Sequence, residues 1–180
     1  MRRMFRRQIR KTLAQEVPPV LQEANFAFDK GEYGRAAELY ERIAQAADAR
    51  GGPRAPILHL QAGRSRVYAG QIALGMPSLQ RGLELFAQRG QQHKLQNAGS
   101  RIVSELQERG LTQEAAEIEA LLKGVAPSLP AMAEPVQTKR PVLPTHCPSC
   151  GAPVRPDEVE WLDEVTAECG YCGSPVREDN

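Results

Sequence analysis

The sequence predicts a mainly α-helical chain that ends in a small β-structured segment organised by a metal ion. Two observations lead to this fold class. Apolar and small residues recur at helical spacing through residues 17–124, where short glycine-centred turns separate the candidate helices. All four cysteines of the chain lie after residue 144. We therefore expect a helical domain over 17–124 and a separate metal-binding domain over 145–180.

The four cysteines form two near-identical motifs, CPSCGAPV from Cys147 and CGYCGSPV from Cys169. This spacing suits four thiolates on one tetrahedral Zn²⁺. Such a site has no open position for water or substrate, so the ion is expected to fold the segment rather than catalyse a reaction. Iron, a redox dithiol and disulfides are the alternatives. The predicted ligands are Cys147, Cys150, Cys169 and Cys172.

These motifs resemble the CxxCG knuckles of zinc ribbons, of the rubredoxin type, and the resemblance covers about residues 144–176. It implies that the knuckles sit on β-hairpins. Apolar and polar residues alternate from Val159 to Ala167 around a polar turn, which predicts a short antiparallel hairpin. Trp161 is expected to cover the metal core. So short a segment buries too little apolar surface alone, so its folding should require the metal.

The helical region repeats. Turn glycines Gly31, Gly70 and Gly110 are each followed five residues later by a small residue. This pattern resembles the tetratricopeptide repeat (TPR), in which small residues let paired helices approach closely. Residues 24–44 carry the resemblance best, and an ordinary helical bundle is the alternative. The resemblance implies about three helical hairpins, whose first helices we expect near residues 20–29, 56–68 and 96–107.

Three features depart from the TPR pattern. Arg66 stands where an aromatic residue is usual, Glu119 stands at a normally apolar place, and Pro77 is expected to interrupt the second helix of its hairpin. The repeat spacing also exceeds the usual ~34 residues. We therefore expect longer loops between repeats, with the stretch at Gly51 as one place for the extra length.

The TPR resemblance implies peptide binding on a concave face lined by the first helices. Asn25, Arg64 and Arg101 loosely resemble the polar clamps with which some TPR domains hold a peptide carboxylate. The alternative is that both arginines are only solvated. The residues that the repeat register places on or near this face are Asn25, Asp29, Arg64, Tyr68, Arg101 and Ser104.

Charge is segregated along the chain although the net charge is only +1. Residues 50–101 hold eight bases and one acid, and residues 145–180 hold two bases and eight acids. This pattern predicts docking surfaces or association between segments.

Residues 1–16 form a basic arm with an apolar stripe. Such an arm could bind an anionic membrane surface, pack on the first hairpin or dock on the acidic ribbon. The bases of the arm are Arg2, Arg3, Arg6, Arg7, Arg10 and Lys11.

Residues 125–144 carry five prolines and predict a semi-extended linker, so the ribbon is expected to move freely unless charge holds it.

The sequence offers little support for enzyme chemistry. The three histidines lie far apart, and no phosphate-binding or dinucleotide motif is present. His59 is expected in the helical core. We therefore expect a non-enzymatic cytoplasmic adaptor for protein or peptide partners, with membrane contact through the arm. Nucleic-acid binding through the basic segments is the alternative, and a thiol redox enzyme is a third hypothesis.

Overall fold

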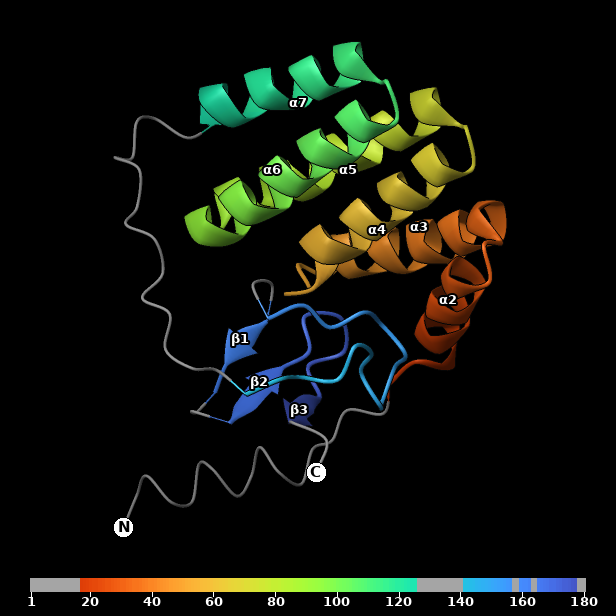
Figure 1. Cartoon of the computed structure of the whole chain (residues 1–180), viewed down its shortest axis with the longest axis vertical. Coiled ribbons are helices and arrows are strands. Elements are labelled where there is room, and N and C mark those ends of the chain that lie inside the picture. Colours follow the sequence, from red (N-terminus) through yellow and green to blue (C-terminus); the bar gives the residue numbers. More distant parts are fainter. Residues whose placement is uncertain (1–16, 126–140, 157–158, 163–164, 178–180) are drawn as a thin grey trace.

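The computed structural model describes residues 17–125, 141–156, 159–162 and 165–177 (Figure 1). These residues form a predominantly helical protein with a small antiparallel sheet near the C-terminal end, so the predicted fold class is confirmed. The basic arm and residues 126–140 of the linker lie outside the described residues. The helices are α2 (Pro19–Asp29), α3 (Tyr33–Ala49), α4 (Ala55–Tyr68), α5 (Ile72–Gln88), α6 (Gln92–Glu108) and α7 (Thr112–Val125). The strands are β1 (Glu160–Trp161), β2 (Thr166–Glu168) and β3 (Pro175–Arg177).

The described helices form hairpins, α2–α3, α4–α5 and α6–α7, which stack in chain order above the ribbon in Figure 1. The first helices of these hairpins fall where the sequence predicts them. Each turn is closed by a glycine in the left-handed region, for which glycine has no Cβ penalty. After α2, the Gly31 N–H donates to the carbonyl of Phe28 and the Glu32 N–H donates to that of Ala27. The same pair of bonds recurs at the other described helix connections, with glycines 51, 70, 90 and 110.

Long helices account for the wide spacing of the turn glycines. The expectation of longer loops is wrong, because α3 joins α4 through residues 50–54 and α5 joins α6 through residues 89–91. Helices α3, α5 and α6 have 17 residues each. The sequence predicts that Pro77 interrupts this helix. That prediction is wrong, because α5 continues through Pro77. Its side chain is exposed, so water can solvate the helix carbonyl that proline leaves without a partner.

Small residues set the close approach of the paired helices. A Cβ built on Gly63 would lie 2.8 Å from the carbonyl oxygen of Gly75, and one built on Gly75 would lie 2.8 Å from that of Gly63. A methyl group at either position would clash with backbone. In the first hairpin the fully buried pair Ala24 and Ala36 occupies the corresponding positions.

The sheet has the order β1-β2-β3, with both strand pairs antiparallel. Trp161 pairs with Ala167, which confirms the hairpin predicted between Val159 and Ala167. The partly buried Trp161 packs on the cluster of buried residues that contains the cysteines. This position agrees with its predicted role as a cover for the metal core.

The core of the described structure is divided in a way that the sequence does not indicate. One cluster contains residues of α2, α3, α4 and the ribbon, and a second contains residues of α4 to α7. Within α4, Leu58 and Ala62 belong to the first cluster, whereas Leu60 and Val67 belong to the second. The linker predicts a ribbon that moves freely unless charge holds it. In the structure the ribbon is docked, and it shares its apolar core with the first hairpin.

Candidate metal centre and the helix–ribbon interface

The four cysteine sulfurs converge on one point. All four Sγ atoms lie within 4.8 Å of one another, and each cysteine is buried. The Sγ atoms of Cys147 and Cys172 are 3.7 Å apart, and those of Cys150 and Cys169 are 3.9 Å apart. A tetrahedral ion with metal–sulfur bonds of about 2.3 Å requires sulfurs about 3.8 Å apart, whereas a disulfide requires about 2 Å. The residues therefore fit a single four-coordinate metal ion.

The two knuckles share one backbone geometry. In the first, the Cys147 N–H donates to the Ala152 carbonyl at 2.8 Å, and the Gly151 N–H donates to the Cys147 carbonyl at 2.8 Å. Gly151 has a φ of 73°, which favours glycine at this turn. The same bonds are formed in the second knuckle by Cys169, Gly173 and Ser174. The two matching turns therefore each present two sulfurs to the site, from opposite sides.

Contacts among the four sulfurs shift the pKa values of the cysteine thiols. The Cys150 thiol lowers the pKa of Cys147 to about 6, and the Cys147 thiol lowers the pKa of Cys172. Contact with Cys147 raises the pKa of both Cys150 and Cys169. Four thiolates this close repel one another unless a cation compensates their charge. A divalent ion would supply that compensation and take the place of the thiol protons.

The first knuckle is held by helix α2. The side-chain amide of Asn25 donates to the main-chain carbonyl of Cys150 at 2.6 Å. The Asn25 carbonyl oxygen accepts a hydrogen bond from the Tyr40 hydroxyl at 2.5 Å. Asn25 and Tyr40 are each only 1% exposed. A second and exposed hydrogen bond runs from Gln22 to the carbonyl of Ser149 at 3.0 Å. The main-chain carbonyl of a cysteine in the candidate metal centre is therefore paired by a buried side chain of the helical domain.

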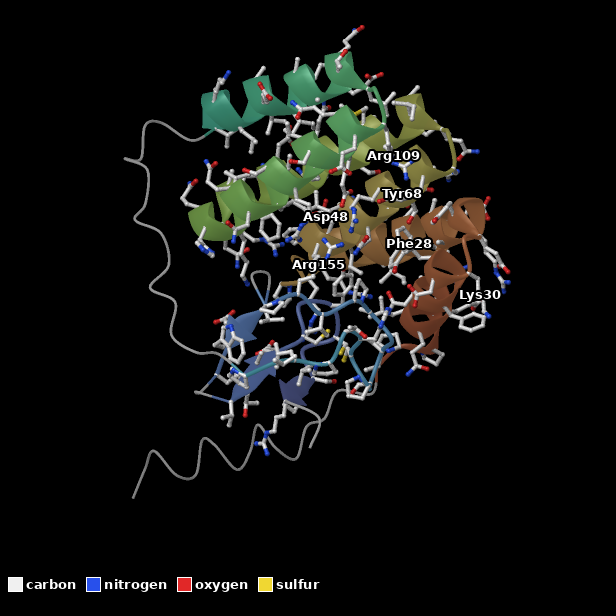
Figure 2. All side chains as sticks on the ribbon, in the orientation of Figure 1. Phe28, Lys30, Asp48, Tyr68, Arg109 and Arg155 are labelled. Carbon is white, nitrogen blue, oxygen red and sulfur yellow. The ribbon has the colours of Figure 1, made fainter. Side chains whose placement is uncertain are left out.

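The second knuckle is held by helix α4. Tyr171 is 4% exposed, and its hydroxyl accepts a hydrogen bond from the Gln61 amide. Burial raises the pKa of Tyr171 to about 12, and the nearby positive charge of Arg64 opposes this shift. A Cβ built on Gly170 would lie 3.4 Å from Cδ1 of Ile57, so this knuckle packs closely on α4. Figure 2 places Arg155 on the side of the ribbon that faces the helices.

Ion pairs surround these contacts. They join Arg54 to Glu168 at 3.8 Å and Lys94 to Glu160 at 3.4 Å, and a carboxylate oxygen of Asp29 lies 3.8 Å from Nε2 of His146. Exposed pairs of this kind contribute about 0–1 kcal/mol each, so they fix orientation more than they add stability. The pairing explains part of the charge segregation, because bases of the central segment meet acids of the ribbon.

The three residues predicted to form a peptide clamp, Asn25, Arg64 and Arg101, do not lie together in one groove. Arg64 makes a bidentate ion pair with Glu105, at 2.8 and 2.6 Å, and its side chain is 11% exposed. Arg64 and Arg101 line the same cavity, whereas Asn25 is engaged by the ribbon. The three residues are therefore not brought together in an open groove.

The remaining predicted residues lie around the helix ends. Tyr68 packs against Phe28 with ring centroids 5.5 Å apart, and the guanidinium of Arg109 lies 3.8 Å from the Tyr68 ring centroid (Figure 2). Asp29 faces His146, and the exposed Ser104 hydroxyl donates to the carbonyl of Ser100. None of these contacts identifies a ligand.

Sequence reasoning missed two interface residues, Gln61 and Tyr171. Tyr171 occupies the position of Ser149 in the second knuckle, so a large aromatic side chain within a four-residue turn was the available signal. The predicted core position of His59 agrees with the structure, where its Nε2 lies 3.4 Å from a carboxylate oxygen of Asp48.

No protein-family model matches the chain, and no curated protein or solved structure matches it at a significant level. Among the described helices, none combines the length and apolar character needed to cross a bilayer.

Proposed function

We propose that this protein is a non-enzymatic, zinc-stabilised adaptor that binds protein partners on a surface built jointly by the helical hairpins and the ribbon. The observation that carries this proposal is the docking of both knuckles on the helices, through Asn25 and Gln61. Four thiolates complete the shell of an ion, so the metal supplies folding energy rather than chemistry. In this role it fixes the shape of a surface.

The helical hairpins support an adaptor role. The close approach at Gly63 and Gly75, and the buried Tyr40 and Leu79 that fill the space between helices, are similar to the packing expected of TPR proteins. Proteins of that kind use stacked hairpins to present extended binding surfaces. Here the ribbon covers part of that face, so partners would meet a composite surface.

Zinc is the ion that we assign to the cysteine cluster. Thiolates suit both zinc and iron, but zinc has no redox chemistry and so matches a buried site with a structural role. Reduced thiols of this kind persist in the cytoplasm, where we place the protein. For the basic arm, residues 1–16, weak and salt-sensitive binding to anionic vesicles remains a prediction.

Nucleic-acid binding has less support. Bases of the central segment are paired with carboxylates of the protein itself, which lowers the positive charge offered to phosphates. The pairs are Arg54–Glu168, Arg64–Glu105, Arg66–Glu41, Arg81–Asp48 and Lys94–Glu160.

Affinity capture from the native cell, followed by mass spectrometry, tests the adaptor proposal. We expect proteins that are enriched by the wild type and lost when Tyr171→Ala disrupts the composite surface. Lys30→Gln, which changes an exposed cation elsewhere, should retain them. Enrichment of nucleic acid with a steep salt dependence, and of no protein, would contradict the proposal and favour the alternative.

A further inference from the structure

A cavity of about 80 Å³ opens between α4, α6 and the second knuckle. Two further cavities of the described structure measure about 10 Å³ each. A buried water needs about 10–15 Å³, so the largest of the three has room for an organic group. Its walls are mainly apolar, as in most sites for small molecules. The apolar and aromatic side chains that line it include Ile57, Leu60, Phe86, Ala98, Ile102 and Tyr171.

The cations beside this cavity are engaged within the protein. Arg64 is held by Glu105 in a bidentate ion pair. The Nζ atom of Lys94 lies 3.4 Å from a carboxylate oxygen of Glu160, and Arg101 also has an interaction within the protein. A charged ligand would have to displace such partners to be compensated, and burying a charge without compensation is costly. The cavity therefore favours a ligand without net charge.

One polar group at the cavity has no partner among the described residues. Gln91 lines the cavity, and its side-chain carbonyl oxygen is buried without a hydrogen-bond donor. Buried polar groups in proteins are nearly always hydrogen-bonded, because a buried acceptor without a donor is costly. A ligand that brings an N–H or O–H group to Gln91 would supply the bond.

The side chains around the cavity suit a flat ring. Phe86 and Tyr171 are both buried, and aromatic rings pack favourably against other rings. The hydroxyl of Tyr171 already accepts a hydrogen bond from Gln61, so this residue offers its ring to the cavity. Arg64 makes its bonds to Glu105 in the plane of the guanidinium, whose face can still stack on an aromatic ring.

We propose that this cavity binds a neutral aromatic small molecule that carries one hydrogen-bond donor, as indole does. The ring would lie among the apolar walls, and the donor would meet the side-chain carbonyl oxygen of Gln91. This site goes beyond the adaptor function, since it takes neither a peptide nor a carboxylate. Gly170 and Tyr171 of the second knuckle line it, so ligand binding should require an intact cysteine cluster.

The test is an NMR titration of the full-length, metal-loaded protein with indole and with benzofuran. These two molecules have nearly the same size and shape, and only indole carries an N–H donor. We expect indole to shift the amide signals of residues 57–64, 91–102 and 170–171 and to bind about fivefold more tightly, as one neutral hydrogen bond allows. Equal affinities would mean that water serves Gln91 as well as the ligand does, and would overturn the proposal. Shifts spread over other surfaces would also overturn it.

Two variants locate the site. Ala98→Phe fills the cavity and should abolish indole binding, with unchanged metal content and far-UV circular dichroism as the check that it is folded. Its matched control is Ala73→Phe, because Ala73 is exposed on α5 and does not line the cavity. Gln91→Leu removes the acceptor and should make the affinities for indole and benzofuran equal. Unchanged indole affinity in folded Ala98→Phe, or a retained preference for indole in Gln91→Leu, would contradict the assignment.

A third probe tests the neutrality of the ligand. Indole-3-acetate has the same ring and adds a carboxylate, and we expect it to bind more weakly than indole. Tighter binding of indole-3-acetate would contradict a site for neutral molecules. Titration of the chelated protein tests the contribution of the ribbon, and indole affinity that survives chelation would contradict it. Capture of protein partners tests the adaptor function separately from each of these results.

Discussion

The side-chain amide of Asn25 donates a hydrogen bond to the main-chain carbonyl of Cys150, which lies 125 residues away in sequence. The bond is buried, and the Tyr40 hydroxyl donates to the other end of the same amide. A buried amide with both ends paired stabilises one arrangement of its neighbours, since any other arrangement leaves polar groups without partners. This chain of bonds connects the first hairpin to the first cysteine knuckle.

Asn25→Ala should lower the free energy of unfolding by about 2 kcal/mol, because it leaves the Cys150 carbonyl and the Tyr40 hydroxyl without a partner. Urea unfolding of the metal-loaded protein measures the change. The control is Gln22→Ala, which removes the exposed bond to Ser149 and should cost less than about 0.5 kcal/mol. Equal effects of the two substitutions would show that the buried bond has no special role.

Gly63→Ala should destabilise the second hairpin by about 1–3 kcal/mol, since the new methyl group would lie 2.8 Å from the Gly75 carbonyl oxygen. Gly34→Ala is the matched control, because Gly34 lies in α3 with nothing within 4 Å of its built Cβ. That change should add about 0.5–1 kcal/mol of stability. Thermal unfolding of both variants distinguishes them, and a stabilised Gly63→Ala protein would refute the close helix approach.

Elemental analysis of protein expressed in its native host should give a zinc-to-protein ratio near ~1. Cys147→Ser should reduce this ratio and expose Trp161, because the site would lose one of its four thiolates. Tryptophan fluorescence follows the exposure. Stoichiometric iron in the purified protein would contradict the zinc assignment, while the four-cysteine site itself would stand.

His59 should make stability depend on pH. Burial lowers the pKa of His59, although Asp48 partly opposes the shift. The unfolded chain, in which histidine titrates near ~6.5, then takes up the proton more readily than the folded protein. Stability is therefore complete above pH ~6.5 and falls as the pH drops from ~6.5 toward the lowered pKa.

Urea unfolding of the wild type and of His59→Gln at pH 7.5, 6.5 and 5.5 isolates this contribution. Loss of metal in acid affects both proteins alike, so the difference between them reports His59. The wild type should lose stability faster than the variant as the pH falls. A difference that stays constant with pH would contradict the role of His59.

Much of the fold could be predicted because its signals are local. Turn glycines such as Gly31 and Gly70 mark the helix ends, and the cysteine spacing indicates the metal ligands, all within short stretches of sequence. The helix bounds follow from the same signals. The sequence does not predict where the extra residues between turn glycines lie. The interval between the glycines is the same whether helices or loops contain these residues, and the structure places them in helices.

The docking of the ribbon could not be predicted, because it depends on contacts between distant residues. The repeat register assigns Asn25 to an exposed concave face, and only the folded chain shows that Cys150 covers it. Similarly, Tyr171 accepts a hydrogen bond from Gln61, which lies 110 residues away in sequence. Charge segregation indicated that segments associate, but it did not indicate which surfaces meet.

The first hairpin and the ribbon share one apolar core, and hydrogen exchange with mass spectrometry can show whether they depend on each other for stability. Exchange is compared between the metal-loaded full-length protein and the same protein after chelation. We predict faster exchange in α2 and α3 as well as in the ribbon, with α5, α6 and α7 still protected by the second core. Faster exchange confined to residues 141–177, with α2 and α3 unchanged, would contradict the claim and indicate an independently tethered ribbon.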